Sequence, residues 1–577
     1  MANLILSEAK ELFEITEFPG VDRRVSSGAY TCRNFRILPD GTLEKREGFN
    51  PITTLPGVPR AIWCGNVFGE EKVFSLIDNV LYETDSQDEG SVELGSVSSV
   101  SGRADFFYCR GGLYLVDGED IYSVSRDGVE RECGYVPIYG RDWSGIVPGK
   151  VNEPVNFLSD RIIVHFKLMD VSFSYLELGI KCSEILGCTL NGLPYENDVE
   201  LSNGGMRIKL SGILPAESEM CFLLRLDSSA VRRSEIRSVT RAAQSGGDSD
   251  SQVLLFGGEN SSRVFALRDV GESALLMSRG MAADSTEMYF PVTDTARLGD
   301  GREAVTAVLP YGGKMLIFTE NGAWISDFST KNTPKITRLS DRVGCLAPLG
   351  VAAGKYAYTV NSSGIFRWDK VQSTLNNFSA TCISGPISEL FSAGFCRGAV
   401  AHYSPLHGEV WFADPNSDDQ TVYVYSEETG NWYTFDPIPA DRFFTLCGRT
   451  AMLCGKYLLD FSPQFKVDIT IGDMEKAGPI EAVYLSPDLD FSMPDRPKRI
   501  RRIMTESLLL GEGIEIDLIG DRMKKPAAVH VACPPDGGIT YSDNRVNTGR
   551  LNRMVFRIKA CGRGRVRVDK LSLAVFK

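Results

Sequence analysis

A loosely repeated unit constrains the fold of this chain more than any other feature of its sequence. Each copy consists of a glycine, an apolar segment, a tight turn and a second apolar segment that often carries Trp or Tyr. Clear copies occupy residues 69–82, 112–122, 313–324, 354–368 and 408–432. Within each half of the chain their first glycines lie about 41 to 54 residues apart, close to the roughly 40–50 residues of a four-stranded propeller blade. The repeat therefore predicts a β-propeller of about six or seven blades.

The local pattern is that of strands rather than helices. Segments with helical apolar spacing are scarce, whereas short β-branched and aromatic runs recur between Gly, Asn-Gly and Asp-Gly turns. Such runs are typical of antiparallel strands joined by hairpins. With 577 residues, 43% of them hydrophobic and 24% charged, the chain is long enough to form several packed domains. We therefore expect a nearly all-β protein.

Two regions depart from the repeat. Between Gly112 and Gly313 only one clear unit is found, at 253–265, and strand-like runs between 161 and 226 predict an inserted β-sandwich. Alternating apolar residues near the end of the chain predict a second sandwich with one solvated face. The predicted domains are an N-terminal arm with propeller-closing strands (1–50), the propeller's first part (51–150), the inserted sandwich (151–240), the propeller's second part (241–475) and the C-terminal sandwich (476–577).

The start of the chain offers strands that could close the propeller. The turn Pro39-Asp40-Gly41 separates the runs Thr31–Ile37 and Thr42–Lys45. We expect these runs to complete the blade begun by the C-terminal end of the ring. Joining both ends of a propeller in one sheet removes its open edges, which otherwise invite uncontrolled strand pairing.

The charge distribution is uneven. The net charge is −13, so the protein as a whole should repel polyanions. From Leu551 to Lys577, however, there are eight basic residues and one acidic residue. Nucleic acid is one possible partner for this segment, but aromatic residues for base stacking are sparse, which favours an acidic neighbouring subunit. The candidate subunit-contact residues are Arg553, Arg557, Lys559, Arg563, Arg565 and Arg567.

The motifs of common enzyme classes are absent from the sequence. It holds no GxGxxG, GxxxxGK[ST], HExxH or GxSxG motif, and its 14 cysteines form no CxxC pair. His402 and His407 near Ser404 could form a proton shuttle, but a hairpin turn explains them as well. We therefore expect no catalytic residue, cofactor or metal. A propeller glycoside hydrolase stays open as a hypothesis, because sequence does not reveal carboxylate separations.

We also expect neither a membrane span nor a secretory signal peptide. No run of about 18 apolar residues could span a bilayer, and Met1–Gly20 lacks the basic and apolar regions of a secretory signal peptide. We expect synthesis and maturation in the cytoplasm with reduced cysteines.

Several segments resemble one family. The opening stretch 18–49, the entry to the insert at 152–159, the blade containing Tyr289-Phe-Pro291 and 315–324, and the closing stretch 552–573 are similar to tail-associated β-propeller proteins of tailed bacteriophages. This resemblance implies a virion structural protein of the tail hub or nozzle. It further implies a ring, six copies in short-tailed phages, around the DNA exit channel below the portal or head-to-tail adaptor. Other tail proteins or fibres and transiently passing phage DNA are the further partners implied.

A second hypothesis places the chain at the distal tail or baseplate, where a propeller could bind host-surface glycans. Its stacking platforms would be Trp324, Trp368, Trp411 and Trp432. Packing within the blades is the alternative role for these side chains. A hub subunit, unlike a glycan binder, should form rings.

Overall fold

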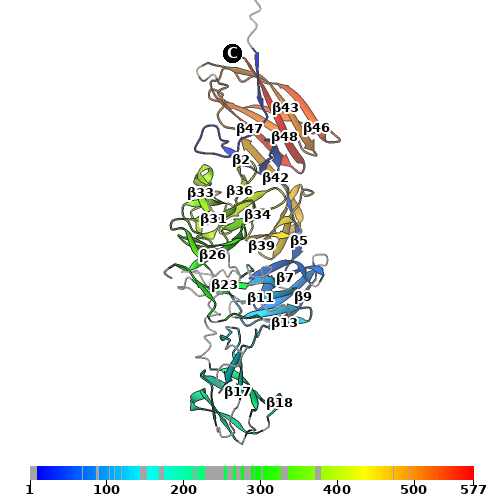
Figure 1. Ribbon diagram of the computed structural model, residues 1–577. Coiled ribbons are helices and arrows are strands. Elements are labelled where there is room, and N and C mark those ends of the chain that lie inside the picture. The colour runs from blue at the N-terminus through cyan, green and yellow to red at the C-terminus, as the bar shows by residue number, and fades with distance from the viewer. Residues whose placement is uncertain are drawn as a thin grey trace, which may run out of the picture. The chain divides into compact units, whose positions relative to one another are not determined.

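We describe the fold from a computed structural model (Figure 1). Two compact units divide the chain, which we name for their places in the sequence: the terminal unit, Met1–Val58 with Val343–Lys577, and the central unit, Pro59–Arg342. The structure describes residues 10–576 apart from 68, 86–89, 103, 110, 118–119, 143–152, 157, 168–174, 196, 212–213, 215–216, 228–252, 256–263, 268–273, 278–287, 292, 300–302, 327–334, 371–377, 447, 472, 493 and 495.

The central unit contains four antiparallel sheets of four consecutive strands each. Each sheet is a meander, as in a propeller blade, and its strands are rich in β-branched and aromatic residues. The strands are β6 (Ala61–Val67), β7 (Glu70–Ile77), β8 (Val80–Asp85) and β9 (Ser91–Ser96); β10 (Asp105–Cys109), β11 (Gly112–Val116), β12 (Ile121–Ser125) and β13 (Gly128–Arg131); β22 (Val253–Leu255), β23 (Val264–Leu267), β24 (Ala274–Met277) and β25 (Thr295–Arg297); β26 (Val305–Tyr311), β27 (Lys314–Thr319), β28 (Ala323–Ser326) and β29 (Thr337–Ser340).

The inserted sandwich lies between the second and third of these sheets in the sequence. Its two sheets enclose a separate core that includes Phe166 and Phe222. The five-stranded sheet has the order β14 (Ile138–Asp142), β15 (Arg161–Lys167), β21 (Glu219–Leu226), β17 (Cys182–Leu190) and β18 (Leu193–Pro194). The three-stranded sheet has the order β16 (Tyr175–Glu177), β20 (Arg207–Leu210) and β19 (Val199–Ser202).

The terminal unit contributes three further four-stranded groups. In the last of them an N-terminal strand, β5, pairs with β40, so residues about 400 positions apart share one blade. The groups are β30 (Val351–Ala353), β31 (Ala357–Asn361), β32 (Gly364–Lys370) and β33 (Phe378–Cys382); β34 (Val400–Ser404), β35 (Glu409–Ala413), β36 (Val422–Ser426) and β37 (Trp432–Phe435); β38 (Arg442–Leu446), β39 (Arg449–Cys454), β40 (Tyr457–Phe461) and β5 (Phe49–Thr54).

The C-terminal sandwich incorporates the N-terminal arm. One sheet has the order β3 (Phe35–Ile37), β4 (Leu43–Lys45), β48 (Arg565–Phe576), β43 (Arg499–Leu510) and β46 (Gly538–Arg545), with β1 (Lys10–Ile15) also on β48. The other has the order β42 (Asp473–Leu485), β47 (Met554–Gly562), β44 (Ile514–Gly520) and β45 (Ala527–Val531), with β41 (Val467–Thr470) beside β42. Figure 1 shows dark-blue β1 among the orange and red strands.

One short strand joins the sandwich to a blade. β2 (Thr31–Arg33) pairs in parallel with β37 and antiparallel with β42. The blade β34–β37 and the second sandwich sheet therefore form one continuous ten-stranded sheet. A single hydrophobic cluster runs from Trp411 and Trp432 in that blade to Phe556 in the sandwich.

The predicted fold class is confirmed: the protein is all-β, a β-propeller with an inserted and a C-terminal β-sandwich. The predicted closing strands are wrong. Thr31–Ile37 and Thr42–Lys45 form β2, β3 and β4, which pair chiefly with the sandwich, whereas Phe49–Thr54 completes the last blade. Alternation alone could not show which of three adjacent short runs reaches the blade.

Two predicted boundaries also shift. The first strand of the insert, β14, pairs with β15 and lies before residue 151. At the other end, β42 begins at Asp473, just before the predicted start of the C-terminal sandwich at 476.

Candidate functional site

Four of the six predicted basic residues lie on β47 or β48, and these four contact acidic residues of the same chain. Arg553 stands just before β47, where its peptide oxygen accepts from Asp521 N at 3.0 Å. Arg563 donates to Ala477 O at 3.0 Å. The ion pairs are Arg557 with Asp517 at 2.5 Å, Lys559 with Glu481 at 3.6 Å, Arg565 with Glu44 at 2.5 Å, and Arg567 with Asp40 and Asp569 at 2.6 Å each.

These basic side chains are therefore already paired within the chain. Asp40 and Glu44 belong to the N-terminal arm, and Glu14 of β1 pairs with Lys570 at 2.6 Å. The basic strands therefore bind acidic groups more than 500 positions earlier in the chain. The sequence does not show these ion pairs, because the acidic residues of the arm lie beside the basic strands only in the folded protein. Contact between these residues and a neighbouring subunit stays a prediction.

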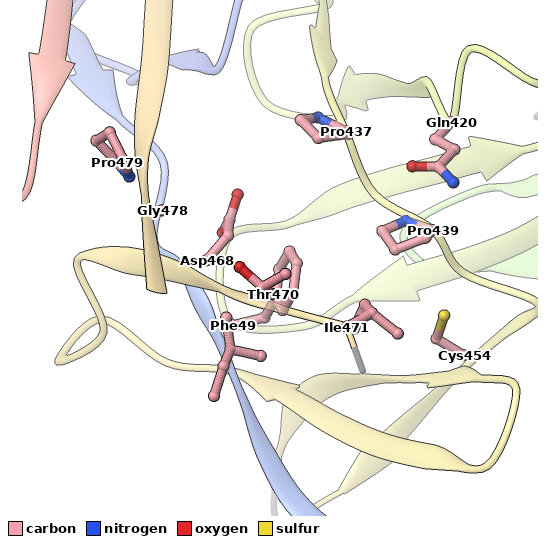
Figure 2. A pocket seen from close by; sticks show the side chains of 11 residues that line it. Phe49, Gln420, Pro437, Pro439, Cys454, Asp468, Thr470, Ile471, Gly478 and Pro479 are labelled. Carbon is pink, nitrogen blue, oxygen red and sulfur yellow. The ribbon is translucent and has the colours of Figure 1, made fainter. Parts of the chain in front are cut away.

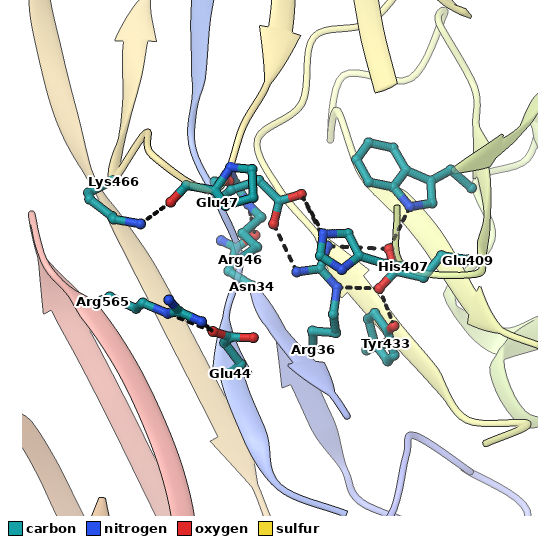
Figure 3. A network of polar contacts seen from close by, with 12 residues as sticks. Asn34, Arg36, Glu44, Arg46, Glu47, His407, Glu409, Tyr433, Lys466 and Arg565 are labelled. Carbon is teal, nitrogen blue, oxygen red and sulfur yellow. Dashed lines mark hydrogen bonds and ion pairs between the residues drawn. The ribbon is translucent and has the colours of Figure 1, made fainter. Parts of the chain in front are cut away.

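A buried polar network lies where the arm meets the blade β34–β37 (Figure 3). The guanidinium of Arg36, on β3, binds Glu47 at 2.8 Å and also Glu409 of β35. Glu409 accepts further hydrogen bonds from Tyr433 Oη at 2.6 Å and Trp411 Nε1 at 2.9 Å. The side chains of Arg36, Glu47 and Glu409 are 4%, 7% and 1% exposed, so one cation is enclosed with two carboxylates.

The network shifts the pKa values of its members. Burial would raise the pKa of Glu47, but Arg36 and the adjacent His407 hold that pKa well below its usual range. Burial would lower the pKa of Arg36, but Glu409 and Glu47 raise it well above the ordinary value. Burial, followed by the neighbouring Glu409, raises the pKa of Tyr433 well above the usual value. Tyr433 therefore stays protonated and donates a hydrogen bond to Glu409.

Asn34 extends this network to the sandwich. Its Nδ2 donates to Asp436 O at 2.6 Å and Glu481 O at 2.8 Å, while its Oδ1 accepts from Asp436 N at 2.9 Å and Arg46 Nε at 2.8 Å. Asn34 has φ of 56°, a left-handed conformation that Asn tolerates better than most residues. Arg46 in turn binds Asp468 at 2.5 Å. A single amide thus joins the end of a blade, β42 and the arm.

Sequence reasoning missed this network. Only a weak feature of the sequence pointed to the network, namely charged residues among apolar ones. Arg36 lies between Phe35 and Ile37, and Glu409 precedes Val-Trp-Phe. Charged residues are rarely buried unless they are paired. Their partners could not be chosen among 75 acidic residues without the tertiary structure.

A cavity of about 460 Å³ lies beside the network, between the closing blade and the β41–β42 hairpin (Figure 2). Asp468 is the charged group on its wall, and that carboxylate already binds Arg46. The remaining lining is mostly apolar: Phe49, Gln420, Pro437, Pro439, Cys454, Ile469, Thr470, Ile471, Gly478 and Pro479.

The tryptophans considered as glycan platforms are buried. Trp324 is 6% exposed, and Trp368, Trp411 and Trp432 are each 1% exposed. They pack within the blades, so stacking of a sugar on these four side chains is excluded without unfolding. The glycan hypothesis therefore loses the residues that motivated it.

The two histidines lie at opposite ends of one hairpin. His402 is on β34 opposite Trp411 of β35, whereas His407 belongs to the turn and contacts Glu47 at 3.2 Å. Burial lowers the pKa of His402 to about 4. Within the described residues no group of three His, Cys, Asp or Glu side chains could hold a metal ion. In the same residues no helix is both long and apolar enough to cross a bilayer.

No family model and no curated protein matches the chain. Among solved structures, the WD40 domain of SCAP from fission yeast is 10% identical, with a TM-score of 0.30 over 74% of this chain and 98% of that one. YCF48 from Cyanidioschyzon merolae is 9% identical, with a TM-score of 0.27 over 72% and 99%. The extracellular domain of a one-component system of B. thetaiotaomicron is 7% identical, with a TM-score of 0.37 over 90% of this chain and 61% of that one. These distant similarities carry no information about ligands or partners.

Proposed function

We propose that this chain is a structural subunit of a bacteriophage tail, within the hub or nozzle ring that surrounds the DNA exit channel below the portal or adaptor. The proposal rests on the resemblance of the opening and closing segments to tail-associated propeller proteins. It describes a protein that acts by assembly, with copies of itself as the first partner.

The observation that carries the proposal is the structural role of the opening motif. Asn34, Arg46, Gly48 and Phe49 all belong to the resembling stretch, and all join the arm to the closing blade or the sandwich. Asn34 and Arg46 bind Asp436, Glu481 and Asp468. A Cβ on Gly48 would lie 1.9 Å from Val467 O. The resemblance therefore falls on framework residues, which supports shared architecture more than chance similarity of turns would.

The strand pairs and ion pairs within the terminal unit also suit a subunit that must hold together under force. The N-terminal arm pairs with β48, β42, β37 and β40 through different strands. Separating the sandwich from the last two blades requires breaking backbone ladders and buried ion pairs together. Such coupling resists local opening, which suits a virion subunit whose described cysteines are free thiols.

The test uses the full chain, alone and mixed with the portal complex encoded by the same genome. We expect light scattering to give the mass of a closed ring, or negative-stain images to show rings stacked coaxially on the portal. A chain that stays monomeric and does not bind the portal in either measurement would refute the proposal. In that case a rise in melting temperature with host envelope polysaccharide would support the distal glycan-binding alternative.

A further inference from the structure

The inserted sandwich carries a nucleophile and a base on its outer surface. On β15 and β21, His165 stands directly opposite Cys221, and Lys167 opposite Glu219. Alternate residues of these strands, such as Phe166 and Phe222, are buried in the sandwich core at 1% and 0% exposure. Because neighbouring side chains on a strand point to opposite faces, His165, Cys221 and Glu219 share the outer face.

The three side chains are arranged as nucleophile, base and orienting acid. His165 Nδ1 lies 3.3 Å from Glu219 Oε1, and His165 Nε2 lies 3.6 Å from Cys221 Sγ. A proton on Nδ1 donated to Glu219 leaves the Nε2 lone pair facing the thiol. Nε2 can then accept the thiol proton, which forms a thiolate beside an imidazolium. The side chains of His165 and Glu219 are 25% and 49% exposed, so small molecules can reach this face.

Three other cysteines in the part of the chain that the structure describes have different surroundings. Cys188 on β17 faces the core, and burial raises the pKa of its thiol to about 11. Across from Cys221 on β17 stands the uncharged Thr189. The exposed thiols of Cys133 and Cys382 contact the Arg131 peptide oxygen and the Ser384 hydroxyl, with no imidazole in either contact. Cys221 differs from these three because the imidazole of His165 contacts it. The titratable groups on β21 and the neighbouring strands include Glu219, Lys167 and Cys188.

We propose that Cys221 is a histidine-activated thiol and a modification site that takes low-molecular-weight disulfides such as oxidised glutathione. The thiol proton passes to His165 Nε2, and the Cys221 sulfur attacks one sulfur of the disulfide. A new S–S bond forms as the original one breaks, and the leaving thiolate takes the proton from the imidazolium. Cys221 is oxidised and half of the disulfide is reduced, so electrons balance without another reagent. This inference is independent of the proposed tail function.

The test measures alkylation of each cysteine in the full reduced chain with limiting iodoacetamide, read by peptide mass spectrometry at pH 6.5 and 8.5. An ordinary thiol with a pKa near 8.5 should react about fifty-fold more slowly at the lower pH. We expect Cys221 to slow by less than about fivefold, and Cys133 and Cys382, which have no imidazole contact, serve as comparisons in the same sample. His165→Gln should give Cys221 the ordinary profile.

A second arm follows the proposed reaction itself. Oxidised glutathione at pH 6.5 should form a mixed disulfide on Cys221 before Cys133 or Cys382, and Cys221→Ser should abolish the early adduct. Circular dichroism confirms that the variants fold. A Cys221 profile as steep as that of Cys133, or one that His165→Gln leaves unchanged, would overturn the inference. So would glutathione adducts spread evenly over the exposed cysteines.

Discussion

Arg36 is enclosed with two carboxylates, and replacing it by methionine should destabilise the terminal unit strongly. Methionine keeps much of the side-chain volume but removes the charge that Glu47 and Glu409 share. Removing one partner of a buried ion pair costs about 3–5 kcal/mol, because the remaining charge stays buried and uncompensated. This free energy corresponds to a decrease of about a hundred- to several-thousand-fold in the folding equilibrium constant. The side chain is 4% exposed, so solvent can screen little of this loss.

The assay is urea unfolding followed by tryptophan fluorescence. Trp411 donates to Glu409 at 2.9 Å, so its emission reports on the network itself. With a urea dependence of about 3 kcal/mol per molar, the midpoint should fall by about 1–1.7 M. The matched control is Arg502→Met, which breaks the exposed pair with Asp543, where the two side chains are 40% and 47% exposed. Such pairs contribute about 0–1 kcal/mol.

A combined variant separates lost charge pairing from lost packing. Adding Glu47→Gln and Glu409→Gln to Arg36→Met removes the uncompensated carboxylates, so part of the stability should return. Equal midpoints for Arg36→Met and Arg502→Met would refute the reasoning. So would a combined variant less stable than Arg36→Met alone.

Three further predictions concern the same unit. The pKa of His402 is lowered to about 4 from 6.5, so the unfolded chain binds more protons between these values and stability should decrease as pH falls through that window. Melting temperatures of His402→Gln should depend less on pH there than those of the unmodified chain. Gly48→Ala should lower the melting temperature by several degrees because its Cβ would lie 1.9 Å from a peptide oxygen, whereas Gly90→Ala, with nothing within 4 Å, should not. Phe49→Ala should cost about 3–5 kcal/mol in urea unfolding, because Phe49 is 2% exposed and packs on Phe461; no change would show that β5 does not hold the closing blade.

Strand-level structure followed from local pattern. The unit predicted at 313–324 forms β27 and β28, and the unit at 354–368 forms β31 and β32. Period-two apolar patterns and hairpin turns are encoded within a dozen residues, so these elements need no information from distant parts of the chain. The spacing of about 41 to 54 residues between the repeated units likewise predicted the blades of a propeller.

Pairing between distant segments was decided only in the folded protein. Which of the adjacent runs at 31–33, 35–37, 43–45 and 49–54 closes the blade depends on partners about 400 positions away. The basic strands near the C-terminus pair with Asp40 and Glu44, more than 500 positions earlier in the chain, which local pattern does not show. Composition and local pattern determined the all-β class, the blade repeat and the two sandwiches. Long-range pairing of strands and charges, which depends on the three-dimensional path of the chain, decided the closing strand, the buried network at Arg36 and the thiol–imidazole pair at Cys221.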